Sequence, residues 1–409
     1  MSNGKSKHFC EKHEPISFCK IPPFLLNTNT HAFMHRMPEH ASHSTERTID
    51  PWGDNLIQDY KKVVTHFGLE AFDSKQFPEP NRLMRRGITF AGRDLKRISE
   101  CISKKKPFYA LTGIQPSADK IHLGTRSVIE NVKYFQEHGA KTYVLVADLE
   151  SAATRGISVE EGKKRAMEFH IPAYLALGLD IEKTQFYFQS ENPTTFRLAF
   201  EAAQKITLNE FKGAYGNPEP GKILAALAQF ADMILPQELE KKPIPGIIPV
   251  GIDQEPHIRL CRDYLHKIES QKRFTAISSI YNQFMPSLDG GTKMSKSKPE
   301  SAIFLPEKIE VTTKAIKCAF TGGRATMEEQ RRLGAEVDKD MVFELLKQQL
   351  VESDKELDKI RVEYASGKML SGEIKQLAIE KMTTFLEKFD ADMVYYQKHI
   401  KDVQFLGFE

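Results

Sequence analysis

Cysteine is scarce in this sequence of 409 residues. The five cysteines, Cys10, Cys19, Cys101, Cys261 and Cys318, are odd in number and scattered along the chain. Small secreted proteins that depend on disulfides carry more cysteine, in even numbers and at close spacing. The content is typical of a reducing compartment, and we expect the protein to be cytoplasmic.

Paired metal-binding clusters are also lacking. The first twenty residues contain His8, Cys10, His13 and Cys19, but no second pair follows at the distance that zinc fingers use. We therefore expect no metal site built from protein side chains. We interpret this segment as a tail without a structural or metal-binding role.

Long hydrophobic runs are absent. No stretch of about 18 consecutive apolar residues occurs, which predicts that no segment spans a membrane. The first twenty residues lack the apolar core of a secretory signal, so export is not expected. The 58 basic and 55 acidic residues nearly cancel, leaving a net charge of +3. Such a balance does not by itself mark a nucleic-acid-binding protein, and any RNA contact must use a local basic patch. The basic run at residues 82–86 is one candidate.

The length predicts two or three packed units. Residues 1–48 are rich in His, Asn, Ser and Pro without a clear period, which indicates a flexible extension. Residues 49–95 have the pattern of short helices and turns, and we expect an N-terminal helical segment there. From residue 306 to 409 apolar residues recur at helical spacing, which predicts a helical C-terminal domain.

Between these parts, over residues 96–305, strand and helix patterns alternate. Short apolar runs typical of buried strands are separated by amphipathic helical stretches. The expected order is a strand at 108–112, a helix at 122–139, a strand at 142–148, a helix at 159–177, and strands at 185–188 and 244–250. This order predicts an α/β fold with a parallel sheet and right-handed crossovers. Such sheets bind ligands at the carboxyl ends of their strands.

A glycine turn followed by closely spaced lysines and serines runs from Leu288 to Lys298. Lys293, Met294, Ser295, Lys296 and Ser297 form its centre. Ammonium groups, hydroxyls and backbone N–H groups suit a polyphosphate, and the glycines let the backbone wrap around it. A solvated basic loop is the alternative that the charges alone would favour.

A second candidate segment follows the strand at 108–112. Its polar and small residues are Gln115, Pro116, Ser117, His122, Leu123, Gly124 and Thr125. Because a helix pattern begins at His122, the segment places a helix N-terminus, with its free N–H groups, beside the strand end. Taken alone, His122 would be an ordinary cap or surface histidine.

Together the two segments resemble class I aminoacyl-tRNA synthetases. The string from Lys293 to Ser297 matches the KMSKS signature of that class, and His122 with Gly124 matches its His-x-Gly-His element except for Thr125. The resemblance extends from about residue 50 to 400 and is closest to tryptophanyl-tRNA synthetases. Residues 251–260, 319–324 and 50–52 are similar to the archaeal and eukaryotic enzymes, whereas 112–117 is similar to the bacterial ones. The fold that this implies is a Rossmann-like catalytic domain, with an inserted dimerisation region, and a helical domain that binds the tRNA anticodon.

The resemblance also implies how the amino acid is recognised. Leu111 and Leu145 stand where eukaryotic tryptophan enzymes carry the tyrosine and glutamine that read the indole, so we expect the bacterial mode, in which Asp232 accepts the indole N–H. A buried acceptor there would reject phenylalanine. Tyrosine enzymes use a Gln-x-x-Asp element that Gln229 and Asp232 also fit. The tyrosyl enzyme therefore stays open, as does a non-charging RNA-binding paralogue.

The implied reaction forms an aminoacyl-adenylate from ATP and then charges tRNA(Trp). We expect His122, Gly124, Lys293 and Lys296 to be catalytic, and Mg²⁺ to bind through the ATP phosphates. The predicted amino-acid site comprises Gly113, Gln229, Asp232, Asp253 and Gln254, while Asp148 and Glu150 read equally as surface residues or substrate contacts. L-Tryptophan, ATP and tRNA(Trp) are the expected ligands of a homodimer that binds neither DNA nor membranes.

Overall fold

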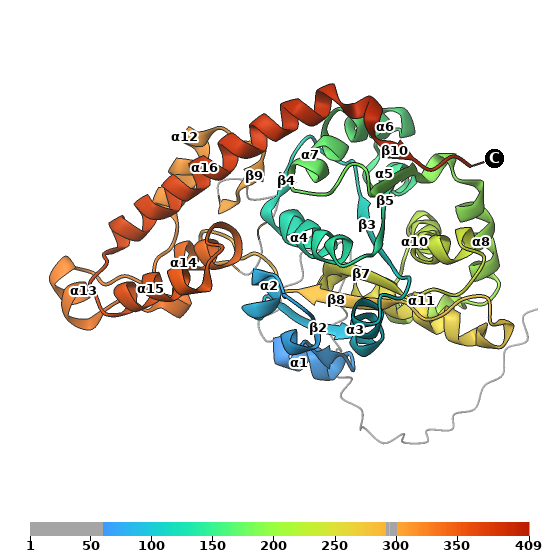
Figure 1. The fold of residues 1–409 in the computed structure, drawn as a ribbon, viewed down its shortest axis with the longest axis horizontal. Helices are drawn as coiled ribbons and strands as arrows, with labels where there is room; N and C mark the ends of the chain where they lie inside the picture. Colours follow the sequence, from blue (N-terminus) through green and yellow to red (C-terminus); the bar gives the residue numbers. More distant parts are fainter. Residues whose placement is uncertain (1–59, 292–293, 295–300, 409) are drawn as a thin grey trace, which may run out of the picture. The chain divides into compact units, whose positions relative to one another are not determined.

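The computed structural model describes residues 60–291, 294 and 301–408, and a mostly parallel β-sheet forms its centre (Figure 1). The strand order is β1-β2-β8-β7-β3-β5-β6-β10, with β1 and β2 antiparallel to their neighbours and the rest parallel. The strands are β1 Glu70–Ala71, β2 Thr89–Arg93, β3 Tyr109–Ile114, β5 Lys141–Val146, β6 Thr184–Phe188, β7 Gly246–Gly251, β8 Ser278–Asn282 and β10 Gln404–Phe405. A separate two-stranded pair joins β4 (Ile121–His122) to β9 (Phe304–Leu305).

Helices cover both faces of the sheet. Those of the N-terminal and sheet region are α1 Tyr60–His66, α2 Arg82–Arg85, α3 Leu95–Ser103, α4 Leu123–Glu137, α5 Asp148–Arg155, α6 Val159–Arg165, α7 Ile171–Ala176, α8 Pro193–Ala203, α9 Leu208–Tyr215, α10 Pro220–Leu239 and α11 Glu255–Lys267. A π-helical turn, η2 (Ala166–His170), joins α6 to α7. Two short 3-10 helices, η3 (Gln189–Glu191) and η4 (Ile252–Gln254), follow β6 and β7.

Successive residues of a strand point to opposite faces, and each face of β3 enters its own core. Tyr109 and Leu111 pack in a cluster that includes residues of α10 and α11. Ala110 and Ile114 pack in a second cluster with residues of α3 and α4. Burial on both sides explains why β3 and β5 read as nearly continuous apolar runs.

The predicted α/β fold with a parallel sheet is confirmed, and the strands lie within two or three residues of their expected positions. The helix expected at 159–177 is α6, η2 and α7. The segment 49–95 was expected to be helical, but from residue 60 on it also supplies β1 and β2, which extend the sheet beyond β8. The missed strand β2 contains Gly92, where a Cβ would lie 2.5 Å from the Ser279 carbonyl oxygen of β8, so glycine permits the close pairing. Residues 1–48 lie outside the described part of the chain.

The C-terminal region is helical, as expected. It comprises α12 Ile309–Cys318, α13 Met327–Leu333, α14 Met341–Leu345, the π-helical turn η8 Leu346–Leu350, α15 Asp354–Ala365 and α16 Ser371–Lys398. The long helix α16, red in Figure 1, leads the chain back to the sheet, where β10 pairs with β6. The hydrophobic core of the C-terminal region is shared with the sheet region, because Ile121 and Leu123 pack in the same cluster as Leu345 and Leu386. Among the described helices none is long and apolar enough to cross a membrane.

The basic run at 82–86 forms a joint between α2 and the C-terminal helices. Arg82 pairs with Glu130 of α4 and, at 2.7 Å, with Glu352. Arg86 donates to the carbonyl oxygens of Lys347 and Val351 at the end of η8, at 2.6 and 2.7 Å. The expectation that this run faces tRNA is wrong for Arg82 and Arg86, because their guanidinium groups are nearly buried and engaged within the protein.

Candidate active site

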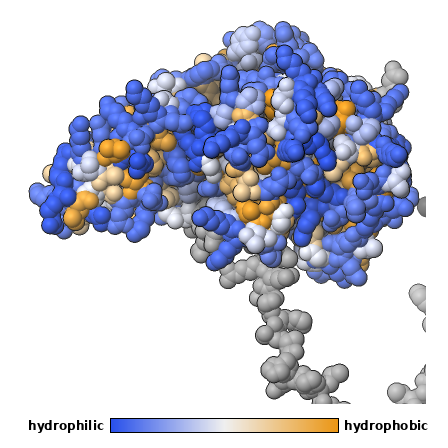
Figure 2. Space-filling view, turned by 60° about the horizontal axis from the view of Figure 1, so that its bottom comes forward, coloured by the Kyte–Doolittle hydropathy of each residue, from blue (hydrophilic) through white to orange (hydrophobic). Residues whose placement is uncertain are grey.

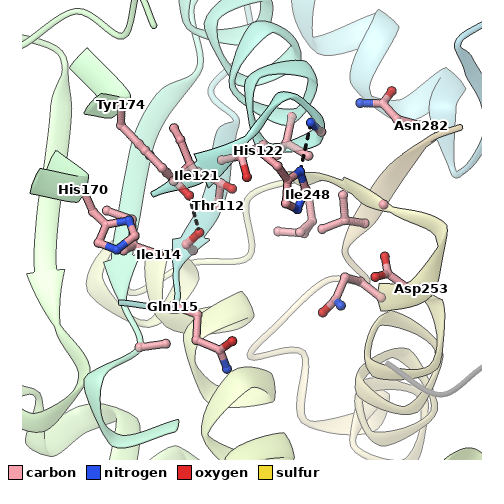
Figure 3. Close-up of a pocket in the computed structure, with 18 of the residues that line it drawn as sticks. Thr112, Ile114, Gln115, Ile121, His122, His170, Tyr174, Ile248, Asp253 and Asn282 are labelled. Carbon is pink, nitrogen blue, oxygen red and sulfur yellow. Dashed lines mark hydrogen bonds between the residues drawn. The ribbon is translucent and has the colours of Figure 1, made fainter. Parts of the chain in front are cut away.

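A cavity of about 400 Å³ opens at the carboxyl ends of β3 and β7. The chain leaves β3 toward β5 on one side, while β7 lies on the other side, so this is the topological switch point of the sheet. Figure 3 shows side chains from several elements converging on the cavity. The residues that line the cavity include Leu111, Gly113, Gln115, His122, Glu150, Gln229, Met233, Val250, Asp253 and Asn282.

His122 lies at the N-cap of α4 and faces the cavity (Figure 3). Its Nδ1 accepts the backbone N–H of Gly124 at 3.0 Å, which satisfies one of the free donors at the helix start. At Gly124 an added Cβ would lie 2.8 Å from Cε1 and 2.9 Å from Nδ1 of His122. Glycine therefore leaves room for the imidazole. Thr125 also lines the cavity, so a hydroxyl stands where the signature has its second histidine.

The end of β3 and the loop that follows it are held by one residue of η2 and one residue of α7. Tyr174 donates its hydroxyl to the Gly113 carbonyl oxygen at 2.9 Å, and His170 Nε2 lies 2.8 Å from the Ala118 carbonyl oxygen. Both side chains also line the cavity, and sequence reasoning missed them. Their only signal is Pro172 in the first turn of α7, which lacks the N–H that a continuous helix would use, because π-helical turns inside helices are frequent at functional sites.

The residues expected to bind ATP around this loop divide into two groups. Gln115 and Ser117 line the cavity, together with His122 and Gly124. Leu123 is fully buried in the hydrophobic core and supports the helix start from behind. Pro116 is absent from the lining and lies against α6, where a Cβ on Gly162 would meet its ring at 3.4 Å. Leu123 and Pro116 thus shape the loop without facing the cavity.

Of residues 293–297, the lysine loop at the centre of the segment from Leu288 to Lys298, only Met294 is described. It is buried, lines the cavity, and donates its backbone N–H to the Met285 carbonyl oxygen at 2.9 Å. Lys293, Ser295, Lys296 and Ser297 lie outside the described residues. The centre of the expected phosphate loop is therefore anchored at the cavity wall through a backbone hydrogen bond and an apolar side chain.

Glu150 lines the cavity and is clamped by two amides. Gln115 Nε2 donates to its Oε1 at 3.1 Å, and Gln229 Nε2 donates to its Oε2 at 2.7 Å. The surface alternative for Glu150 is therefore wrong. Asp148 is also buried, but its carboxylate accepts the backbone N–H of Ser190 at 3.0 Å and the Ser190 hydroxyl at 2.5 Å, which ties α5 to η3. Asp148 does not line the cavity.

Asp232 lies behind the cavity wall. Its side chain is fully buried and is absent from the lining, although Met233 and Gln229 of the same helix are present. The carboxylate accepts hydrogen bonds from Gln189 at 2.7 Å, Thr195 at 3.0 Å and Tyr187 at 3.2 Å. Burial raises the pKa of Asp232 to about 7 against these hydrogen bonds, which lower it. This arrangement does not present the carboxylate to an indole, contrary to the expectation of direct contact.

Asp253 and Gln254 lie in η4, directly after β7, and both line the cavity as expected. A Cβ on Gly251 would lie 2.5 Å from Asp253 Oδ1, so glycine lets this carboxylate fold back over the strand end. Glu255 begins α11 and forms a buried ion pair with Arg93 of β2 at 2.6 Å. The pair holds the helix start, and with it the turn that carries Asp253.

Asn282, at the end of β8, is a lining residue that sequence reasoning did not single out. Its Oδ1 accepts from Thr89 at 2.8 Å and from Asn131 at 2.9 Å, which links β8, β2 and α4 behind the cavity. The signal was a polar residue at the end of a buried strand. Among the described residues no group of three or more His, Cys, Asp or Glu side chains is placed to hold a metal ion.

Comparison with known proteins agrees with this geometry. The sequence model of the family "tRNA synthetases class I (W and Y)" matches residues 103–387. Tryptophan–tRNA ligases of Hyperthermus butylicus and Aeropyrum pernix are 38% and 39% identical to this chain; each match covers 83% of this chain, and 93% and 92% of the respective relatives. A crystal structure of tryptophanyl-tRNA synthetase from A. pernix superposes with a TM-score of 0.79 at 37% identity, covering 88% of this chain and all of that one. The chain belongs to the class I tRNA synthetases for tryptophan and tyrosine, within the tryptophanyl-tRNA synthetase family.

Proposed function

We propose that the protein activates L-tryptophan with ATP, releasing pyrophosphate, and then transfers the tryptophanyl group to tRNA(Trp). The observation that carries the proposal is the composition of one cavity. A capped helix N-terminus, an apolar wall and a carboxylate clamped by two amides open into the same space. The relatives named tryptophan–tRNA ligase support tryptophan over tyrosine.

Adenylation needs no side-chain nucleophile. A carboxylate oxygen of tryptophan attacks the α-phosphorus of ATP, a new O–P bond forms, and the bond to pyrophosphate breaks. The protein contributes by holding the two reactants in line and by stabilising the charge that builds on the phosphate oxygens. The start of α4 brings a positive dipole end to those oxygens, and because Nδ1 of His122 accepts from Gly124, the imidazole can donate to them from Nε2.

Lys293 and Lys296 would grip the β- and γ-phosphates. They flank Met294, whose side chain lines the cavity, and no more than about 7 Å of backbone separates each lysine from it. Ser295 and Ser297 would add hydroxyl donors. Mg²⁺ would arrive with ATP as a ligand of its phosphates and neutralise part of their charge.

The amino acid would occupy the other end of the cavity. Leu111, Leu145 and Met233 give apolar surface for an aromatic ring. Glu150 offers a negative charge to the α-ammonium group, and Gln115 and Gln229 hold it in place from either side. Gly113, Asp253 and Gln254 would approach the remaining polar groups of the amino acid or the ribose from the ends of β3 and β7.

The test is ATP–pyrophosphate exchange with each amino acid. We expect exchange that depends on tryptophan and at least a hundredfold lower kcat/KM with tyrosine, a margin on the scale that buried polar contacts provide. Exchange that depends on tyrosine would favour the tyrosyl alternative. No exchange with either amino acid, in the presence of Mg²⁺, would favour a non-charging paralogue.

A homodimer would use the apolar face formed by α8 and α10. A groove of about 310 Å³ lies there, lined by Phe196, Phe200, Leu224 and their neighbours. Phe200 is 72% exposed and Leu224 is 64% exposed, which is costly for a lone protein surface and normal for an interface. Phe200→Asp should convert a dimer to a monomer in light scattering, whereas the distant Val362→Asp should not.

The C-terminal helices would contact tRNA. Figure 2 shows an apolar patch on this region, at the left of the view. Met327, Leu333 and Val362 of α13 and α15 are more than half exposed. Arg332 of α13 offers a guanidinium plane on which the unstacked bases of single-stranded RNA loops can stack.

We also propose a cytoplasmic location, and this proposal rests on the low cysteine content alone.

A further inference from the structure

The carboxylate expected to read the indole sits behind the cavity wall, and its partners suggest a different task. Asp232 Oδ2 accepts the Nε2 amide of Gln189 at 2.7 Å. Gln189 Oε1 in turn accepts the backbone N–H of Glu150 at 3.3 Å. Gln189 and Asp232 are fully buried, and neither lines the cavity, whereas Glu150 does. A chain of two hydrogen bonds therefore runs from α10 through η3 to the first turn of α5.

The order of donors and acceptors in this chain is fixed. A glutamine amide has one donating end and one accepting end. Because Asp232 offers an oxygen to Gln189, the NH₂ end must face Asp232 and the oxygen must face Glu150. If the amide flipped, its NH₂ group would meet the Glu150 N–H, donor against donor, and would leave two buried groups unpaired.

The order survives protonation of Asp232. The other oxygen, Oδ1, faces the hydroxyls of Tyr187 and Thr195, and hydroxyls can accept as well as donate. A proton on Oδ1 could therefore be donated to a hydroxyl, while Oδ2 still accepts from Gln189. The orientation of Gln189 does not depend on the charge of Asp232.

Resting on the proposed function, we propose that Asp232 is a positioning residue: through Gln189 it fixes the start of α5, so that Glu150 meets Gln115 and Gln229 at the tryptophan end of the cavity. Direct contact between Asp232 and the indole is not part of this arrangement. Without the fixed turn, the Glu150 carboxylate would lose one of the contacts that aim it at the substrate's ammonium group. Tryptophan binding should weaken while the ATP end, built on α4 and the lysine loop, stays intact.

The proposal is tested by exchanging donor and acceptor. Gln189→Glu places two carboxylates face to face, and a shared proton restores a hydrogen bond between them at low pH. The KM for tryptophan should therefore rise with pH, to roughly tenfold or more above wild type by pH 9, the cost of one broken buried hydrogen bond. The KM for ATP should change less than about threefold. Adding Asp232→Asn to Gln189→Glu restores the order, because the introduced asparagine amide can donate to the new carboxylate, which still accepts from Glu150. The double variant should return to within about threefold of wild type, as should Asp232→Asn alone.

Two further variants separate positioning from folding. Gln189→Leu removes the relay and leaves the Asp232 carboxylate in place, and it should raise the KM for tryptophan as Gln189→Glu does. Gln136→Leu is the matched control: it deletes a buried glutamine that bridges Thr184 at 2.9 Å and the Asp180 N–H at 2.9 Å, at the far end of α4. It should lower Tm and leave the KM for tryptophan unchanged.

A tryptophan analogue with sulfur in place of the indole N–H distinguishes direct reading from positioning. Wild type and Asp232→Asn should discriminate against it equally. Loss of discrimination in Asp232→Asn, a double variant that is not rescued, or a Gln189→Leu enzyme with the wild-type KM would each overturn the relay. The proposed function fails separately, if the wild type catalyses ATP–pyrophosphate exchange with neither tryptophan nor tyrosine. If the wild type catalyses exchange and every variant has the same KM for tryptophan, only the relay is overturned.

Discussion

Gly124→Ala tests whether the position of the His122 imidazole is needed for adenylation. The new Cβ would lie 2.8 Å from Cε1 and 2.9 Å from Nδ1 of the imidazole, well inside van der Waals contact. The backbone of α4 is held by its hydrogen bonds, so the side chain of His122 must turn away by roughly 1 Å. The cap bond from the Gly124 N–H, 3.0 Å long, would then be lost or bent.

Stability should change little. Loss of a side-chain cap costs about 1 kcal/mol, and replacing glycine by alanine within a helix returns part of it. For a protein of this size, 1 kcal/mol corresponds to a Tm shift of about 2 °C. Activity should fall much further, because a displacement of about 1 Å in a group that meets the reacting phosphate can cost about a hundredfold in rate.

The measurement is kcat and KM in tryptophan-dependent ATP–pyrophosphate exchange, with Tm from calorimetry. Gly213→Ala is the matched control, since a Cβ at Gly213 in α9 meets nothing within 4 Å. It should raise stability slightly, by about 0.5 kcal/mol, and leave exchange unchanged. A Gly124→Ala enzyme with kcat within threefold of wild type would refute the role given to His122. An equal loss in both variants would refute the steric reasoning.

Three further predictions concern other groups. Lys296→Ala should lower the adenylation rate at least a hundredfold while tryptophan affinity stays within threefold, and equal losses in both would exclude a transition-state role. Glu150→Gln should raise the KM for tryptophan about tenfold or more without a comparable change for ATP; an unchanged KM would move the ammonium site elsewhere. Burial raises the pKa of Asp232 to about 7, so its ionisation disfavours the folded state as pH rises from about 4, its unfolded pKa, to 7. The Tm of wild type minus that of Asp232→Asn should therefore be lower at pH 8 than at pH 5, and a constant difference would contradict the raised pKa.

Local patterns in the sequence determined the fold class and the reaction class. The segments that form β3 and β5 are apolar on both faces, because helices cover both sides of the sheet. Such continuous apolar runs can be recognised from the amino-acid sequence. The position of His122 at a helix start could also be predicted from the sequence. Its cap bond joins residues only two positions apart, so both partners lie within one motif. The short strands β1 and β10 left no such signal, because a strand of two residues has no period to detect.

Tertiary structure decided the identity of the cavity's polar groups. Gln115, Glu150 and Gln229 meet although they come from a loop and two separate helices, and nothing in the spacing of the sequence predicts a hydrogen bond between them. For Asp232, too, the sequence could not predict the contacts of the side chain. Its type and its place on a helix were visible in the sequence, but which side of the cavity wall it occupies depends on how α10 packs against β6 and α8. Sequence specifies periodicity along an element, and only packing between elements decides which polar atoms face a ligand and which face one another.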